Sequence, residues 1–276
     1  MRMRRSFKKT VALILAAQLA LGALTAAGVS AEPVPTPVPG TPYNAQSEYD
    51  VNLPHVIIHQ VYGAGLTTDN KVLVSHGFIE LFNPTDQDVD LSGWSLHYAD
   101  RGSNAQTGPT LEWEKLDLTG TIKAHSSYLI KGKATGAASP RLDLTDKGDQ
   151  VWDRFFNNKG MKVALMSNQD ALHDVNPFVT KPAGYVDMVG TASNDSGSDI
   201  DGYETDYPTG SLEGTSKKKS IRRFEFTDTD NNKADFRQID YETATAGQLV
   251  EYGPRDSSDG DWANDPEPLT IETASL

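Results

Sequence analysis

The chain has 276 residues, no cysteine, and 38 Asp and Glu against 25 Lys and Arg. Without cysteine an exported form of the chain cannot use disulfides and must be held together by packing or by a metal ion. The net charge of −13 argues against nucleic acid or anionic lipid as partners bound through general electrostatics.

The first 31 residues have the pattern of a secretory signal peptide. Five basic residues between Arg2 and Lys9 precede the apolar stretch Val11–Val29, and Val29-Ser30-Ala31 offers small residues to a signal peptidase. The alternative is that the apolar stretch stays in the membrane as an anchor. Cleavage leaves 20 basic and 38 acidic residues, a net charge of −18, and no membrane span in the mature chain. We expect a bacterial protein that is secreted or held at the cell surface.

Residues 32–54 are a predicted spacer. Five prolines occur in the eleven residues from Glu32 to Pro42, which favours an extended, semi-rigid conformation. Residues 43–53 are polar, and we expect them to be poorly ordered. The predicted folded domain spans residues 55–252, and residues 253–276 are a predicted polar C-terminal tail.

Within the domain, short stretches rich in β-branched and aromatic residues are separated by Gly, Pro, Asn and Asp, which predicts a series of short strands. Such a pattern is typical of an all-β sandwich or barrel. The helix-compatible segments are short, 150–156 and 243–249. The expected strands are 55–62, 78–82, 89–91, 94–98, 110–118, 127–131, 162–166, 185–189, 220–226 and 236–239.

The stretch from His76 to Tyr98 contains two of these strands. Pro84 prevents the first strand from continuing, and Gly93 supplies a position that takes a positive φ angle before Trp94. We expect two adjacent strands whose apolar side chains form core, with Trp94 between two sheets. A Trp94 that stacks on a ligand is the alternative.

Several segments in this order resemble the bacterial form of the lamin tail domain. The resemblance implies an immunoglobulin-like β-sandwich. It also implies a non-catalytic accessory module, because the family has no established catalytic residues. Two long loop inserts, Gly132–Asn158 and Thr191–Ser216, depart from the family pattern. The segments that carry the resemblance are His59–Gly63, Phe78–Pro84, Val89–Leu96, Leu118–Ala124 with Tyr128–Ile130, Gly160–Leu165 with Val186–Gly190, and Ser220–Arg223 followed by Asp228–Phe236.

One segment suggests a metal site. Asp228, Asp230, Asn232 and Asp235 offer side-chain oxygens at short spacings, and Ca²⁺ takes six to eight oxygen ligands from such loops. The segment lacks the Gly and Glu of an EF-hand loop. The alternative is a polar turn in which Asp and Asn side chains bond to their own backbone.

Two other charged segments have weaker functional interpretations. The acidic stretch Asp195–Gly202 is a solvated insert or, alternatively, a weak cation site. The basic run Lys217–Lys219, followed by Arg222 and Arg223, is expected to pair with neighbouring carboxylates, and a contact to a polyanion is the alternative.

The sequence contains no H-E-x-x-H, G-x-S-x-G, P-loop or G-x-G-x-x-G motif. The first hypothesis is therefore a non-catalytic secreted or cell-surface binding module, whose partner is an extracellular protein or a cell-wall polysaccharide. A calcium-assisted extracellular hydrolase or nuclease is the second hypothesis, and a purely structural spacer domain is the third.

Overall fold

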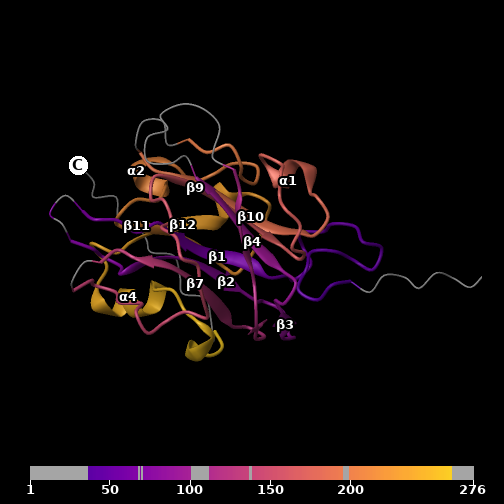
Figure 1. Cartoon of the computed structure of the whole chain (residues 1–276), viewed down its shortest axis with the longest axis horizontal. Helices are drawn as coiled ribbons and strands as arrows, with labels where there is room; N and C mark the ends of the chain where they lie inside the picture. The colour runs from indigo at the N-terminus through magenta and orange to yellow at the C-terminus, as the bar shows by residue number, and fades with distance from the viewer. Residues whose placement is uncertain are drawn as a thin grey trace, which may run out of the picture. The chain divides into compact units, whose positions relative to one another are not determined.

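The computed structural model describes residues 37–67, 69, 71–100, 112–136, 139–194 and 199–262. Strands dominate this part of the chain (Figure 1), as predicted, and the helices are short. The strands are β1 (Ile57–Tyr62), β2 (His76–Phe82), β3 (Val89–Asp90), β4 (Ser95–Asp100), β5 (Glu114–Asp117), β6 (Thr121–Ile122), β7 (Ser127–Ala134), β8 (Gln150–Val151), β9 (Gly160–Met166), β10 (Tyr185–Ala192), β11 (Lys219–Arg223) and β12 (Phe236–Asp240). The helices are α1 (Pro177–Thr180), α2 (Gly210–Glu213), α3 (Asn232–Asp235), α4 (Ala246–Tyr252) and the 3-10 turn Ser257–Asp259.

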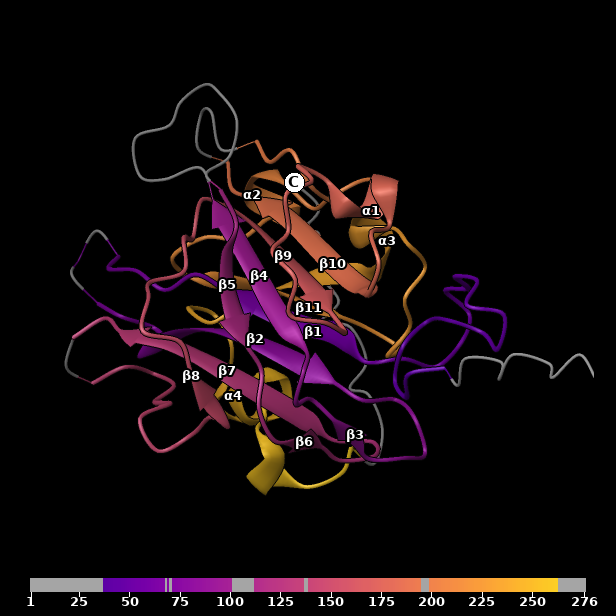
Figure 2. The same ribbon diagram turned by 45° about the vertical axis from the view of Figure 1, so that its right-hand side comes forward.

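The strands form two sheets that face each other. A six-stranded sheet has the order β12-β11-β1-β2-β7-β8, and a four-stranded sheet has the order β10-β9-β4-β5. Figure 2 shows β4, β5, β9 and β10 together as one layer, with β2, β7 and β8 in the other. Neighbouring strands are antiparallel except β7 and β8, which run parallel. The all-β, immunoglobulin-like sandwich expected from the sequence is confirmed.

The two strands of the His76–Tyr98 stretch are not partners in one sheet. β2 pairs with β1 and β7, whereas β4 pairs with β5 and β9 in the opposite sheet. The prediction that these two strands are adjacent was therefore wrong, because they belong to opposite sheets. The turns at Asn83-Pro84 and Ser92-Gly93, with the small β3–β6 ribbon between them, carry the chain from one sheet to the other. Gly93 has a φ angle of +92°, as predicted.

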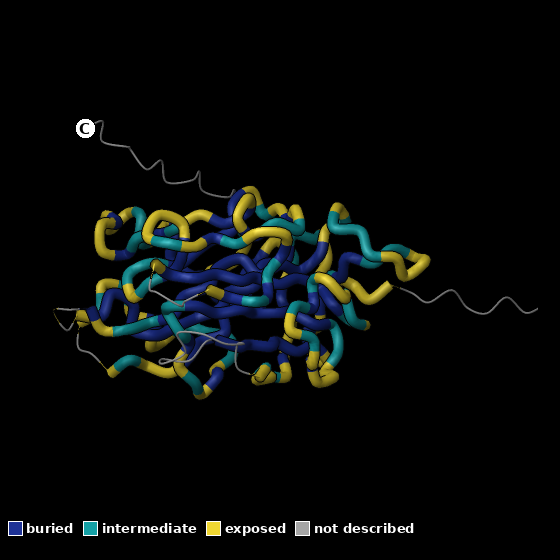
Figure 3. Tube along the Cα trace, turned by 90° about the horizontal axis from the view of Figure 1, so that it is seen from above, coloured by how far each residue is buried: buried dark blue, intermediate teal, exposed yellow. Residues whose placement is uncertain are grey.

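The core lies between the sheets. It takes Ile79 and Leu81 from β2, Leu96 from β4, and Trp94, which is 2% exposed. Figure 3 shows the buried trace running through the middle of the described domain, with exposed loops around it. The prediction that Trp94 is a core residue is confirmed.

The outer face of the six-stranded sheet is covered as well. Tyr62, Phe78 and Tyr241 point to this face and pack with Leu144 and with Tyr252 of α4 in a second apolar cluster. Sheets of antiparallel strands often leave one face to solvent. Here a loop and α4 bury that face, so the strands are apolar on both sides.

One predicted helix is absent and the other is present. Residues 150–156 are not helical, because Gln150 and Val151 pair with β7 and the side chains of Trp152 and Phe156 enter the core. The second segment does form a helix, α4, which begins after Thr245. The Thr245 side chain accepts a hydrogen bond from the backbone N–H of Gln248 in a capping box.

Parts of the predicted spacer and tail contact the sandwich. Tyr49 donates a hydrogen bond from its hydroxyl to Asp230, 2.6 Å away, and the indole N–H of Trp262 donates to Ser127 Oγ at 2.9 Å. The exact domain boundaries stay predictions, and residues 1–31 lie outside the described part of the chain. Among the residues that the structure describes, no helix is long and apolar enough to cross a membrane.

Candidate functional site

Two arginines at the end of β11 point in opposite directions. Arg222 and Arg223 are both fully buried. Successive side chains on a strand alternate between the two faces of a sheet. Arg223 therefore shares a face with Ile221, which lies in the sandwich core, and Arg222 shares the outer face with Phe224. The two arginines of β11 thus have different surroundings, one in the sandwich core and one on the outer face.

Arg223 is surrounded by acidic side chains from three segments. Its Nη2 lies 2.9 Å from Asp187 Oδ1 on β10, and its Nη1 lies 2.9 Å from Asp228 and 2.7 Å from Asp235. Glu204 is 3.9 Å from Nη2. We call these five residues the Arg223 cluster. A guanidinium offers a planar fork of donors that suits several carboxylates at once, and this cluster uses both ends of the fork.

The four carboxylates differ in how readily they ionise. Burial raises the pKa of Asp187 to about 7 against the opposing attraction of Arg223. Burial, reinforced by Asp228 and Asp187, raises the pKa of Glu204 well above its usual range. Burial also opposes ionisation of Asp228, but Arg223 and His55 outweigh it and hold the pKa of Asp228 below its ordinary value. Proton uptake by part of the cluster thus offsets the excess of acid over base.

His55 adds a second cation to the cluster when it is protonated. Its Nε2 lies 3.2 Å from Asp228 Oδ2, and its Nδ1 lies 2.6 Å from the carbonyl oxygen of Leu53. Burial opposes protonation, but the hydrogen bond to Asp228 leaves the pKa of His55 above its usual value. This histidine joins the start of the domain to the Asp228–Asp235 loop.

The predicted calcium ligands do not point to a common centre. Asp228 and Asp235 both bind Arg223. Asp230 takes part through other contacts: its Oδ1 accepts the hydroxyl hydrogen of Tyr49, and its backbone N–H donates to Asp228 Oδ1 at 3.0 Å. This local bond is the side chain-to-backbone turn that was the alternative to a metal loop.

Asn232 is directed away from the other three. Its Oδ1 accepts hydrogen bonds from the backbone N–H groups of Gly190 and Glu204, at 2.9 and 3.0 Å. Its amide nitrogen donates to Met188 O and to Glu204 Oε2. The side chain is fully buried, and its oxygen already serves two donors. Asn232 therefore fastens α3 to β10.

A different acidic trio has the spacing of metal ligands. Asp187, Glu204 and Asp228 each offer an oxygen within 4.8 Å of the others. The cation bound to these three is the Arg223 guanidinium, so an ion at this position would have to displace a buried side chain. Calcium binding stays a prediction.

The second acidic stretch is only partly described. Residues 195–198 lie outside the described residues. Asp201, beyond them, pairs with the buried ammonium of Lys162 at 3.0 Å, and Glu204 belongs to the Arg223 cluster. The described acidic groups that follow the gap thus have structural partners.

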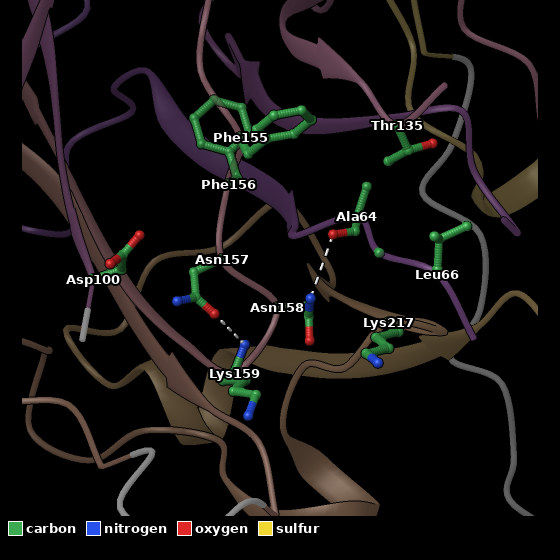
Figure 4. A pocket seen from close by; sticks show the side chains of 11 residues that line it. Ala64, Leu66, Asp100, Thr135, Phe155, Phe156, Asn157, Asn158, Lys159 and Lys217 are labelled. Atoms are coloured by element: carbon green, nitrogen blue, oxygen red, sulfur yellow. Dashed lines mark hydrogen bonds between the residues drawn. The ribbon is translucent and has the colours of Figure 1, made fainter. Parts of the chain in front are cut away.

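A cleft of about 410 Å³ lies at the other end of β11 (Figure 4). Four segments meet to form it: the turn after β1, the end of β4, the insert 132–158, and Lys217 just before β11. Both sheets contribute to it, as loops at the end of a sandwich commonly do. Its lining includes Leu66, Asp100, Thr135, Phe155, Asn158 and Lys217.

Glycine allows the turn after β1 to lie directly against the insert. A Cβ on Gly63 would be 2.3 Å from the carbonyl carbon and oxygen of Asn157. The side-chain amide of Asn158 donates to the carbonyl oxygen of Ala64, 3.3 Å away (Figure 4). The end of the first insert is therefore packed onto the sandwich, and one wall of the cleft is built from it.

Two neighbouring phenylalanines have opposite roles in the insert. Phe156 is 2% exposed and belongs to the sandwich core, whereas Phe155 is 59% exposed and lines the cleft. Leu66, on the other wall, is 45% exposed. Large apolar side chains left in solvent inside a concave site are typical of ligand binding.

Comparison with known proteins identifies the fold family. Residues 52–179 match the family model described as Lamin Tail Domain. The matched range is less than half of the chain, and over it the chain is similar to a lamin tail domain. The family has an immunoglobulin-like fold and is non-enzymatic.

Relatives outside the family model are remote. No curated protein matches the chain. A solved structure of a DUF4876 family protein from Bacteroides thetaiotaomicron is 13% identical, and the alignment covers 66% of this chain and 70% of that one with a TM-score of 0.38.

The match to the lamin tail domain model ends before β10. It includes the first insert and the residues that form most of the cleft. Asp187, Glu204, Arg223, Asp228 and Asp235 all lie beyond it. The resemblance to the closing motif of the lamin tail domain, noted in the sequence, covers the Arg223–Asp235 part of the cluster.

Phe155 and Lys217 were not predicted as site residues, and Trp262 was not predicted as a structural residue. Lys217 belonged to a recognised basic run, but nothing in the sequence indicated that it meets the turn at Gly63–Gly65. Trp262 packs over Arg222 and Arg255, whose guanidinium carbons lie 5.0 and 4.2 Å from its ring centre. It was assigned to a polar tail.

Proposed function

We propose that this protein is an exported, non-catalytic lamin tail domain module that binds an extracellular polysaccharide in the cleft at the start of β11. The observation that carries the proposal is Phe155, an aromatic side chain more than half exposed in a concave site. Its neighbour Phe156 is anchored in the core, so the ring is held at the wall of the cleft. An aromatic face positioned in this way suits the apolar C–H face of a sugar ring.

The polar lining supports the same proposal. Asp100 and Thr135 line the same cleft as Phe155, where Asp100 Oδ2 also accepts the hydroxyl hydrogen of Tyr98 and the Thr135 hydroxyl donates to Ser75 O. Sugar hydroxyls need such donors and acceptors next to an apolar platform. A protein partner would bury a much larger and flatter area than this cleft provides.

The alternatives have less support. A calcium-assisted hydrolase or nuclease needs carboxylates that reach a substrate. The carboxylates of the Arg223 cluster are buried, and Asp187 and Asp228 accept hydrogen bonds from Arg223. A purely structural spacer has no need of an exposed Phe155. Export depends on the predicted signal peptide and is part of the proposal.

Co-sedimentation of the purified protein with insoluble cell-wall polysaccharides tests the binding. Phe155→Ala should abolish retention. Val151→Ala is the matched control, because Val151 is 61% exposed on the same insert but does not line the cleft. Equal retention of both variants, or no retention of the unmodified protein by any polysaccharide, would contradict the proposal.

Cell fractionation tests export. The protein should be found in the medium or on the cell surface, and its N-terminal sequence should show whether cleavage follows Ala31. Retention in the cytoplasm would contradict the proposed localisation.

A further inference from the structure

The three lysines at the start of β11, Lys217–Lys219, have different environments. Lys218 Nζ lies 2.6 Å from Glu242, and Lys219 Nζ lies 3.7 Å from Asp240. Among the residues that the structure describes, Lys217 has no acidic partner, and it is the one lysine of the run that lines the cleft. The run was expected to pair with neighbouring carboxylates. That expectation holds for Lys218 and Lys219, while Lys217 faces the cleft.

Lys217 is held in position without an ion pair. Its backbone carbonyl oxygen accepts a hydrogen bond from the hydroxyl of buried Tyr62 at 2.6 Å. Its stem passes over Gly65, where an added Cβ would be 3.2 Å from Lys217 Cγ. In Figure 4 the Asn158 side chain lies between the side chains of Asn157 and Lys217. A lysine whose backbone and stem are both fixed loses less conformational entropy when its ammonium binds a ligand.

The setting of Lys217 indicates an anionic group on the ligand. Ammonium groups on the surface of a chain with net charge −13 usually find a carboxylate nearby, as Lys218 and Lys219 do. A cation left without one in a ligand cleft is available to a carboxylate of the ligand, with which it forms a charge-assisted hydrogen bond. Phe155 lines the same cleft, so one ligand would contact the Lys217 ammonium with its anionic group and the Phe155 ring with an apolar face.

The overall charge restricts the kind of anion. A dense polyanion such as a nucleic acid carries a phosphate at every residue and is repelled by an acidic protein surface. A polysaccharide in which neutral sugars separate the uronic acid sugars can place one carboxylate beside Lys217 and carries fewer negative charges for the acidic protein to repel. Asp100, which also lines the cleft, can accept hydrogen bonds from sugar hydroxyls.

We infer that the ligand of the cleft is an acidic polysaccharide in which uronic acid sugars are spaced by neutral sugars, with a sugar face on Phe155 and a carboxylate at Lys217 Nζ. This inference rests on the proposed function, because it names the class of polysaccharide bound at the same cleft.

Isothermal titration of the purified protein against hyaluronan and a glucuronoxylan, in which neutral sugars separate the uronic acid sugars, tests it. Each polymer is paired with its carboxyl-reduced, neutral form. At least one acidic polymer should bind, its neutral form should bind at least about tenfold more weakly, and Lys217→Ala should weaken binding of the acidic polymer by about tenfold, the ratio expected for loss of a charged hydrogen bond.

Lys218→Ala is the matched control, because Lys218 belongs to the same run but pairs with Glu242 outside the cleft. Lys217→Arg keeps the charge and should retain most of the affinity. The uronic acid inference is overturned, and the proposed function stands, if three results occur together. The neutral and acidic forms bind equally, Lys217→Ala binds like Lys218→Ala, and Phe155→Ala does not bind. Failure of every acidic and neutral polymer to bind overturns both.

Discussion

The two ends of β11 carry basic residues with opposite surroundings. At its end, Arg223 is fully buried and bound to Asp187, Asp228 and Asp235. Just before its start, Lys217 lines an open cleft and has no acidic partner among the described residues. In the sequence, the first region contains closely spaced acidic residues that suggest a metal site, and the second contains no such motif.

The difference shows that a dense set of acidic residues is not by itself a functional site. In the Arg223 cluster every carboxylate is directed at the arginine, at a backbone N–H or at a neighbouring side chain. These contacts hold the surrounding segments together. In the cleft few groups are present, but they are accessible. Each region should therefore respond to a different measurement, stability for the first and binding for the second.

The largest effect is expected from removing the cation of the buried cluster. Arg223→Met leaves three close carboxylates without their partner, and breaking a buried ion pair in this way costs about 3–5 kcal/mol of unfolding free energy. Urea denaturation at neutral pH measures this loss. The loss should shrink at pH 5, where Asp187 and Glu204 hold their protons. A variant as stable as the unmodified protein would show that the cluster does not stabilise the fold.

A smaller effect is expected where the cleft is built. In Gly63→Ala the new Cβ meets the backbone of Asn157 at 2.3 Å, and forced overpacking of this kind costs about 1–3 kcal/mol. Binding of polysaccharide should fall as well, because the insert must shift. Gly247→Ala is the control: a Cβ there has no closer contact than 4.0 Å, so the variant should be at least as stable and bind normally.

The pH dependence of stability separates the cluster from the cleft. The folded-state pKa of Glu204 is raised above its unfolded value of 4.5, so the folded protein keeps a proton that the unfolded chain has lost. Its contribution to stability is therefore present at low pH and falls as pH rises above about 4.5, by at most about 1.4 kcal/mol per pH unit. Glu204→Gln should show a weaker fall between pH 5 and pH 7 than the unmodified protein.

Other groups do not obscure this comparison. Burial, followed by the effect of Lys115, lowers the pKa of His97 to about 4, so its contribution rises with pH over the same range. Burial likewise lowers the pKa of His76. Both histidines are present in the two proteins, so their contributions cancel in the difference. Identical pH slopes would contradict the raised pKa of Glu204. Lys217→Ala should leave the slope unchanged.

The smallest effect is expected from calcium. A ligand that binds only the folded state raises the melting temperature. Because Arg223 already neutralises Asp228 and Asp235, and Asn232 Oδ1 serves two backbone donors, we expect millimolar calcium to leave the melting temperature unchanged. A rise that is lost in Asp230→Ala would establish the calcium site predicted from the sequence and would make the Arg223 cluster a place where metal and arginine compete.

Much of the fold could be predicted because its signals are local. Strand positions follow from β-branched and aromatic stretches bounded by Gly and Pro, and the order of the segments pointed to the lamin tail domain. The strand expected at 220–226 is present as β11, and alternation along a strand places Arg222 and Arg223 on opposite faces. The partners of strands were not predictable in this way: β2 and β4 are close in the chain but belong to opposite sheets, because sheet pairing depends on contacts between distant segments.

The candidate site was predicted poorly for the same reason. Asp228, Asp230, Asn232 and Asp235 are close in sequence, and that proximity suggested a common ion. In the structure their neighbours come from elsewhere: Tyr49 from the predicted spacer, Glu204 from the second insert and Arg223 from β11. The cleft combines four segments that share no sequence signal, and Trp262 covers the outer sheet face from a segment assigned to a tail.

By itself, the sequence determined that the domain is all-β and that Trp94 is buried, since both depend on local composition and on the period of apolar residues. The order of its segments carried the resemblance to lamin tail domains. Only the tertiary structure decided where the acidic residues direct their oxygens and which lysine of the run is left in a cleft. Charged side chains are long and find their partners across the fold, so spacing along the chain does not reveal which partner each one meets.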